Sequence, residues 1–137
     1  MIEYRNLRVA ILGGGSVGSQ VASLLLKHGS ELADRAGAGL ELVGVAVRNP
    51  DAPRDTDIPA ELITTDASSL ILGADIVVEL IGGIEPARTY ILQALQSGAD
   101  VITAPPAVIM SLFNHVLTDK GLAAFEADWA KTGQSIL

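Results

Sequence analysis

The strongest constraint on the fold is a run of glycines that stands where the hydrophobic pattern changes its period. Residues 7–12 are aliphatic and partly β-branched, as in a short buried strand, and the glycine run begins at Gly13. The next apolar residues have the i, i+4, i+7, i+8 spacing of one helix face: Val17, Val21, Leu24 and Leu25. The sequence therefore predicts a strand, a tight turn and a helix that Ser16 caps and Gly29 ends.

Strand and helix patterns go on alternating along the rest of the chain. Hydrophobic runs predict strands at residues 40–47, 62–65, 75–81, 101–103 and 122–127. Helices are expected at residues 67–72, 85–98 and 108–119, whereas residues 30–39 and 48–59 have the composition of loops. Strands separated by helices need right-handed crossovers. We therefore expect an α/β, Rossmann-like fold, with a mostly parallel, doubly wound sheet and helices on both faces.

Composition narrows the classes of partner. The chain has 137 residues, which predicts a single domain over residues 1–137, and its formal net charge of −7 disfavours nucleic acid and anionic membrane as partners. With no cysteine, thiol nucleophiles and cysteine-ligated metals are excluded, and His28 and His115 are interpreted as helix-surface residues. No signal-peptide pattern or run apolar enough to span a membrane is found in the sequence. We expect a cytoplasmic protein.

The glycines at positions 13, 15 and 18 fit the pattern G-x-G-x-x-G, which binds dinucleotides where it joins a strand to a helix. Gly13 permits the tight turn, Gly15 lets the backbone approach a pyrophosphate, and Gly18 lets the helix lie against the sheet. The free amides of the first helical turn, around Ser16 and Val17, then bind the pyrophosphate. The alternative is a strand-to-helix turn that needs glycine for its shape alone.

The end of the second strand selects between two cofactors. An acidic residue there binds the ribose 2′-hydroxyl of NAD, whereas an arginine suits the 2′-phosphate of NADP. The sequence reads Val47, Arg48, Asn49, so Arg48 is the candidate phosphate ligand and NADP is favoured. Arg54 in the same loop is a weaker second candidate, and for both arginines the alternative is a solvated loop residue. Asp51 is an alternative ribose contact, which keeps NAD open.

Ligands of parallel sheets lie over the carboxyl ends of the strands, which directs attention to two further places. Gly82 and Gly83 follow the fourth predicted strand, and Thr103 ends the fifth. The glycine pair either lets a nicotinamide ribose approach the backbone or forms a plain turn. Glu79 is a lone acid in an apolar strand and is interpreted as a hydrogen-bonded structural residue rather than a catalytic one.

Taken together, these motifs resemble the NAD(P)-binding domain of homoserine dehydrogenase. That oxidoreductase interconverts aspartate semialdehyde and homoserine in the biosynthesis of threonine, isoleucine and methionine. The resemblance is carried by residues 9–18, by residues 44–48 and, most specifically, by the run Val-Val-Glu-Leu-Ile-Gly-Gly-Ile-Glu-Pro-Ala-Arg at residues 77–88. It extends in order over about residues 7–104.

The resemblance implies a role for each part of the site. The glycine turn would hold the pyrophosphate, Arg48 the adenosine 2′-phosphate, and Gly82, Gly83 and Thr103 the nicotinamide half of the cofactor. In the family the substrate site, the catalytic residues and the dimer interface lie in a following domain. No catalytic residue is therefore assigned in this chain, and a separate or missing catalytic and dimerisation domain is its expected partner.

After Thr103 the chain departs from the family pattern. The family reads Thr-Ala-Asn-Lys-Ala-Leu, with the lysine near the reacting groups, whereas this chain has Pro105 and Pro106 at the corresponding places. Glu126 and its two neighbours match the family's Phe-Glu-Ala motif, which implies Glu126 as a ligand of a monovalent cation. Residues 128–133 are bulky and charged where the family has a glycine turn of small residues.

Three hypotheses follow for the function. The first is an NADP(H)-binding domain of a homoserine dehydrogenase-like oxidoreductase that is inactive alone. The second is a non-enzymatic module that uses NADP(H) to regulate a partner. The third is a stable domain whose changed C-terminal segment no longer admits the cofactor. Binding separates the third from the others, and oxidation of homoserine with an added catalytic domain separates the first from the second.

Overall fold

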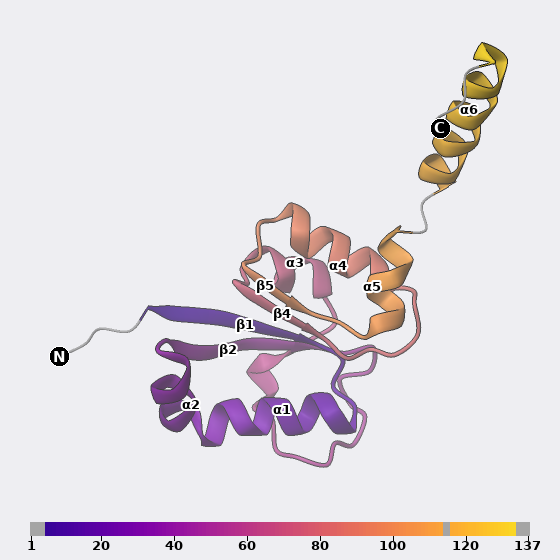
Figure 1. Ribbon diagram of the computed structural model, residues 1–137. Coiled ribbons are helices and arrows are strands. Elements are labelled where there is room, and N and C mark those ends of the chain that lie inside the picture. Colours follow the sequence, from indigo (N-terminus) through magenta and orange to yellow (C-terminus); the bar gives the residue numbers. More distant parts are fainter. Residues whose placement is uncertain (1–4, 114–115, 134–137) are drawn as a thin grey trace.

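The structure, a computed structural model, describes residues 5–113 and 116–133 of the chain. Its centre is a parallel sheet that contains five strands among these residues (Figure 1). In chain order they are β1 (Asn6–Leu12), β2 (Gly39–Ala46), β3 (Ile63–Thr64), β4 (Ile76–Glu79) and β5 (Val101–Thr103). In space the order is β3-β2-β1-β4-β5, and each neighbouring pair runs parallel.

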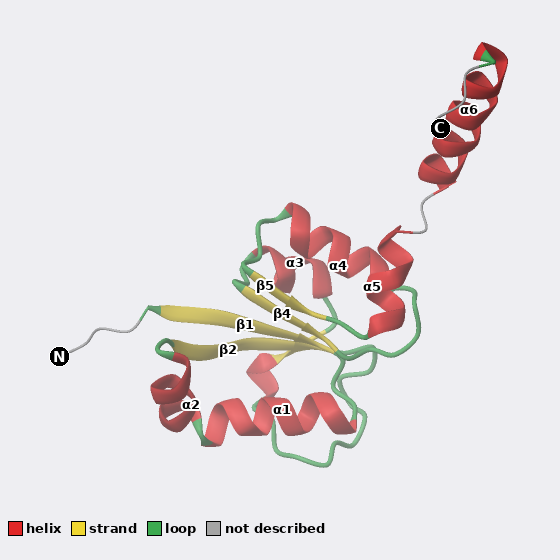
Figure 2. Ribbon diagram, in the orientation of Figure 1, coloured by secondary structure: helices red, strands yellow, loops and turns green. Residues whose placement is uncertain are grey.

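Helices cover both faces of the sheet. One face carries α1 (Ser16–Lys27) and α2 (Gly29–Ala36), and the other carries α3 (Ala67–Leu72) and α4 (Ala87–Gln96) (Figure 2). A short 3-10 turn, η1 (Ala60–Leu62), precedes β3, and α5 (Pro106–Phe113) follows β5 and packs against α4. The last helix is α6 (Val116–Thr132). The expected α/β, Rossmann-like, doubly wound architecture is confirmed.

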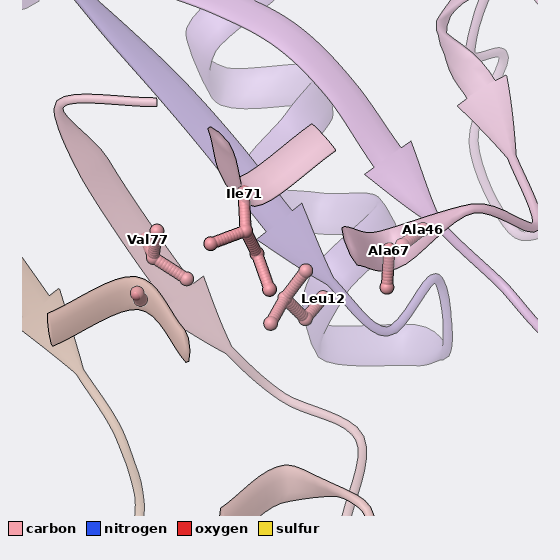
Figure 3. Packing of buried hydrophobic residues seen from close by; sticks show 6 residues of the cluster. Leu12, Ala46, Ala67, Ile71 and Val77 are labelled. Carbon is pink, nitrogen blue, oxygen red and sulfur yellow. The ribbon is translucent and has the colours of Figure 1, made fainter. Parts of the chain in front are cut away.

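The alternation of side chains along the strands builds one core on each face of the sheet. On the face of α3 and α4, Leu12, Ile71 and Val77 have no exposed surface and pack together (Figure 3). On the opposite face, Ile11 packs with Ala22 of α1. Successive residues of β1 thus enter opposite cores, as the pleat of a strand requires. Because the sheet is covered on both faces, its strands read as nearly continuous apolar runs.

The strands and helices up to β5 lie close to their predicted places. The runs at 40–47, 75–81 and 101–103 contain β2, β4 and β5, and the helix expected at 67–72 is α3. The run at 62–65 holds only the two residues of β3, because its first residue belongs to η1. The strong apolar runs therefore predict where these elements lie, and the observed ends differ from the predicted ends by a few residues.

Two expectations about the first βαβ unit are wrong. Residues 30–39 do not form a loop, because α2 begins at Gly29 and is ended by Gly37 in the left-handed conformation. The segment contains alanine, leucine, glutamate and arginine, which favour helix, and Arg35 pairs with Glu31 one turn earlier at 2.9 Å. Ser16 does not cap α1, because Gly15 is the N-cap and no side chain bonds to that helix end.

The expectation for the C-terminal segment is wrong as well. Residues 122–127 form no strand; they lie inside α6, which runs through Gly121. The single helix expected at 108–119 is replaced by α5 and the first part of α6. The run Leu-Ala-Ala-Phe-Glu-Ala is rich in good helix formers. Because α6 lies away from the sheet, none of the described strands stands beside this run to pair with it (Figure 1).

His28 lies between α1 and α2 with its side chain 55% exposed and its Nδ1 3.6 Å from a carboxylate oxygen of Glu31, which confirms the surface placement. His115 lies outside the described residues. Within residues 5–113 and 116–133, no helix combines the length and the apolar character needed to cross a bilayer.

Candidate functional site

The turn between β1 and α1 uses glycine because backbone atoms approach it closely. Gly13 has a φ of +108°, its amide donates to the carbonyl of Ala46 at 2.9 Å, and a Cβ on it would lie 2.6 Å from the carbonyl oxygen of Leu80. A Cβ on Gly18 would lie 1.8 Å from the carbonyl oxygen of Gly13. Only glycine fits at either place, so the turn ties together the ends of β1, β2 and β4 and brings α1 against them.

Gly15 differs from these two glycines because it faces open space. A Cβ on Gly15 would meet no atom within 4 Å. The amide of Ser19 donates to the carbonyl of Gly15 at 2.8 Å, which leaves the three preceding amides, those of Ser16, Val17 and Gly18, without an acceptor inside the helix. Free amides at the positive end of a helix dipole suit an anion, and the open space above Gly15 gives one access.

A pocket of about 470 Å³ opens beside this turn, at the carboxyl ends of β1, β2 and β4. Its walls come from the glycine turn, the loop after β2, the residues after β4 and the start of α4. Of the residues predicted for the site, Gly13, Gly15 and Arg48 line the pocket, and so does Arg54. Gly18 is buried beneath the turn, and Ser16 and Val17 are exposed at the start of α1.

Some pocket residues escaped the sequence analysis. Pro86 and Tyr90 line the pocket from the start of α4, and Leu80 and Ile81 line it from the segment after β4. Tyr90 lies on the helix that connects β4 to β5, and a local pattern does not show that the start of this helix approaches the ends of β1 and β2. Two sequence signals could have found these residues: Leu80 and Ile81 end the predicted strand at 75–81, and both lie, with Pro86, in the run at residues 77–88 that carries the family resemblance.

The loop after β2 holds two arginines in different states. The Arg48 side chain is exposed, and no hydrogen bond or ion pair of the described residues involves it. Arg54 donates from Nη2 to the carbonyl of Asn49 at 2.8 Å and from Nη1 to the carbonyls of Pro50 at 2.8 Å and Ala52 at 2.9 Å. None of the described residues that line the pocket is acidic. The pocket therefore presents positive charge, and Gly15 on its wall directly precedes the free amides of α1. Both features fit the phosphates of a dinucleotide.

Asp51 does not line the pocket. Its amide donates to the side-chain oxygen of Asn49 at 3.0 Å, which forms a local turn in the loop, and its side chain is exposed. The observed geometry therefore gives the alternative of Asp51 as a ribose contact no support within the described residues.

Glu79, at the end of β4, has no exposed surface. Its Oε1 accepts from the amide of Ile81 at 2.5 Å, and its Oε2 is buried without a partner among the described residues. Half of the expectation is met, since one oxygen is hydrogen-bonded and shapes the segment that lines the pocket. The other oxygen lacks the partner that was expected.

The residues expected at the nicotinamide half lie at the same edge of the sheet but outside the pocket. Gly82 and Gly83 have φ values of +84° and +78°, and the space around both is open within 3.9 Å. Thr103 ends β5 and stands beside Val78 of β4 in the register of the sheet. Two successive left-handed residues require glycine, so the pair forms a sharp turn whether or not a ligand approaches it.

Glu126 lies on α6, where every side chain from Lys120 to Thr132 is exposed. Among the described residues, no three or more carboxylates or histidines gather in a way that would hold a metal ion. The role of Glu126 as a cation ligand stays a prediction.

Comparison with known families agrees with this geometry. A family model described as homoserine dehydrogenase, NAD binding domain, matches residues 13–124. The chain belongs to this family. Homoserine dehydrogenase of Corynebacterium glutamicum is 47% identical to it over 103 residues, which are 74% of this chain and 23% of that protein. The resemblance drawn from the sequence motifs is confirmed.

Solved structures place the homoserine dehydrogenase NAD-binding domain on the same fold. The crystal structure of S. aureus homoserine dehydrogenase at pH 7.5 superposes with a TM-score of 0.65 and 30% identity, and the match covers 72% of this chain and 26% of that chain. This homoserine dehydrogenase-type chain thus spans about a quarter of the length of these two relatives.

A second kind of relative matches a shorter part of the chain. A probable transaldolase of Rhizorhabdus wittichii is 71% identical over 48 residues, which are 35% of this chain and 22% of that protein. No motif in the sequence analysis had indicated this similarity.

Proposed function

We propose that the chain binds NADP(H) as the cofactor domain of a homoserine dehydrogenase-like oxidoreductase. The observation that carries the proposal is the pocket itself, which joins the glycine turn of α1 to Arg48 and Arg54 and has no acidic residue on its described walls. An acidic residue at the end of β2 is the feature that would favour NAD. Its absence there, with an unpartnered arginine in its place, favours NADP.

Each part of the site has a role in this proposal. The free amides after Gly15 hold the pyrophosphate, and Arg48 binds the 2′-phosphate in a charge-assisted hydrogen bond. Gly82, Gly83 and Thr103 lie beside the nicotinamide half. The cofactor supplies hydride transfer at C4 of its nicotinamide ring, and this chain supplies binding and orientation.

In the complete enzyme the hydride would pass between the nicotinamide and the aldehyde carbon of aspartate semialdehyde, in the biosynthesis of threonine, isoleucine and methionine. The substrate site and the catalytic residues would come from a separate domain, because the matched part is 23% of the homoserine dehydrogenase relative. The chain alone would turn over little, and its place of action would be the cytoplasm.

The transaldolase similarity supports a composite interpretation of the sequence. The matches to the two kinds of relative cover 74% and 35% of this chain, which together exceed its whole length, so the two matched segments overlap. The most specific homoserine dehydrogenase run ends at Arg88, and the departures from the family pattern begin at Pro105. We therefore assign the transaldolase-like segment to the C-terminal end, where 48 residues contain part of α4 as well as β5, α5 and α6.

This composite interpretation favours a second candidate function, a non-enzymatic module that binds NADP(H) and regulates a partner. Pro106 stands where the homoserine dehydrogenase pattern has a lysine near the reacting groups, and α6 exposes its apolar side chains. Under this alternative the cofactor binds, but no added catalytic domain restores oxidation of homoserine. That assay, with a homoserine dehydrogenase catalytic domain supplied separately, distinguishes the two functions.

The Arg48→Ala variant tests the proposed cofactor. Loss of a charged hydrogen bond to the 2′-phosphate should weaken NADPH binding by about 1.5–3 kcal/mol and leave NADH binding nearly unchanged, as measured by calorimetric titration. Arg35→Ala is the matched control, because Arg35 lies on α2, pairs with Glu31 and does not line the pocket. Equal weakening of both cofactors by Arg48→Ala would refute the role in 2′-phosphate binding.

A further inference from the structure

Arg54 lies deeper in the site than its place in a loop suggests. Its Nε would be 3.3 Å from a Cβ built on Gly14, so the guanidinium lies directly over the middle of the glycine turn. The same Cβ would lie 2.6 Å from Cγ1 of Val47 at the end of β2. Arg54 therefore bridges the glycine turn and the end of β2.

The three hydrogen bonds of Arg54 fix the guanidinium but leave two of its five N–H donors unused, the one on Nε and one on Nη2. Its two Nη atoms donate to the carbonyls of Asn49, Pro50 and Ala52, which are neutral acceptors. Its Nε is buried and has no partner, and Arg54 forms no ion pair with any described residue. A buried charged N–H without an acceptor is unfavourable, so this position suits an anion that enters the pocket.

We propose that Arg54 is a second specificity-determining residue, whose Nε donates to the 2′-phosphate of NADP(H). The position of the Arg54 Nε indicates that it contacts the 2′-phosphate and not the pyrophosphate. The pyrophosphate belongs at the free amides that follow Gly15, whereas the adenosine ribose lies at the end of the second strand, where Val47 and Arg54 meet. This inference rests on the proposed NADP(H) binding.

Arg54 and Arg48 have different roles in binding the 2′-phosphate. Arg54 is held in place by three loop carbonyls before any ligand arrives, so little side-chain entropy is lost when it binds. Arg48 is exposed and unpartnered among the described residues, so it is free to close on the other side of the phosphate.

The experiment uses Arg54→Gln and Arg54→Lys in the full chain, titrated with NADPH, NADH, adenosine 2′,5′-bisphosphate and ADP. Arg54→Gln should weaken the two ligands that carry a 2′-phosphate by about ten- to a hundredfold. NADH and ADP should change by no more than about threefold, because they lack that phosphate. Arg54→Lys keeps the charge and should give an intermediate loss. Arg35→Gln, on exposed α2, serves as the control and should change none of the four affinities.

Each other outcome has a definite meaning. Equal weakening of all four ligands, in variants that keep the thermal stability of the parent chain, would show that Arg54 only shapes the loop and would overturn the inference. A larger loss for ADP would assign Arg54 to the pyrophosphate and overturn it too. If the parent chain is folded and binds none of the four, the proposed function fails and this inference fails with it.

Discussion

The sheet region, residues 5–103, and the helix α6 both carry large apolar side chains, but only the sheet region buries them. Ile11, Leu12 and Ile71 have no exposed surface, whereas Phe125 on α6 is 64% exposed. The local pattern of a helix depends on its own residues, while burial needs a complementary surface from elsewhere in the chain. The difference shows that α6 carries large apolar side chains that no surface of the described residues covers.

The similarity to homoserine dehydrogenase also differs between the sheet region and the C-terminal segment. The homoserine dehydrogenase motifs lie in the sheet region, where close neighbours explain Gly13 and Gly18 of the turn and Gly15 faces open space. The departures from that family begin after β5, in the segment that we assign to the transaldolase-like part.

The difference in burial between the sheet region and α6 is tested by removing one large apolar side chain from each region. Leu12→Ala should lower the free energy of unfolding by about 2–5 kcal/mol, because it leaves a cavity in the core of the sheet. Phe125→Ala should change it by less than about 0.5 kcal/mol, because the ring is exposed. Urea unfolding measures both values. A comparable loss from Phe125→Ala would mean that α6 packs on the rest of the protein.

Two glycines of the turn allow a second comparison inside the sheet region, because Gly18 is buried and Gly15 faces open space. Gly18→Ala should destabilise the fold by about 1–3 kcal/mol, because its Cβ would collide with the carbonyl oxygen of Gly13. Gly15→Ala should change stability by less than about 1 kcal/mol and should weaken NADPH binding, because its Cβ enters open space beside the pocket. Thermal unfolding and titration separate the two effects. The prediction is wrong if Gly15→Ala binds NADPH as well as the parent chain does.

Trp129, the one tryptophan of the chain, reports on α6 alone. Its indole is 37% exposed and stacks on Phe125 with ring centroids 6.4 Å apart. Acrylamide should quench its fluorescence readily in the native chain, only modestly less than in urea, and saturating NADP⁺ should not alter the quenching. Strong protection of Trp129 in the native chain would show that another surface covers α6.

The smallest effect concerns Asp66, the N-cap of α3. Its carboxylate accepts from the amide of Ser69 at 2.9 Å and from the hydroxyl of Ser69 at 2.7 Å, and the backbone bond first and the hydroxyl second lower the pKa of Asp66 below its ordinary value. A lowered pKa in the folded state stabilises the protein above the ordinary value of 3.8, and this contribution is lost as the pH falls through the lowered pKa.

Asp66→Ala should therefore lower the melting temperature slightly at neutral pH, and the difference from the parent chain should shrink in acid. Asp66→Asn is the control, because asparagine caps a helix without titrating. A difference between parent and alanine variant that stays constant down to the acid limit of folding would contradict this account of the cap.

Much of the fold was predictable because its signals are local. The apolar runs of β1, β2, β4 and β5 and the glycine turn are visible as patterns of neighbouring residues. The segment at 122–127 was not predictable as a helix from hydrophobicity, because a short apolar run fits a buried strand equally well. Only the absence of a neighbouring strand decides between the two.

The candidate site also contains some residues that local sequence signals predict and others that depend on the tertiary fold. Gly13, Gly15 and Arg48 were predicted to belong to it from their places at strand ends, and they line the pocket. The approach of Arg54 to Gly14 depends on how the whole loop after β2 folds, and Tyr90 arrives through a crossover. The spacing of residues along the chain predicts neither of these two contacts.

The most direct test of the account is a calorimetric titration of the full 137-residue chain with NADPH, repeated with NADH at the same salt concentration. The account predicts that both cofactors bind and that NADPH binds more tightly, because the sheet region forms its site without help from α6. No heat with either cofactor, from a chain shown to be folded by its unfolding transition, would contradict it.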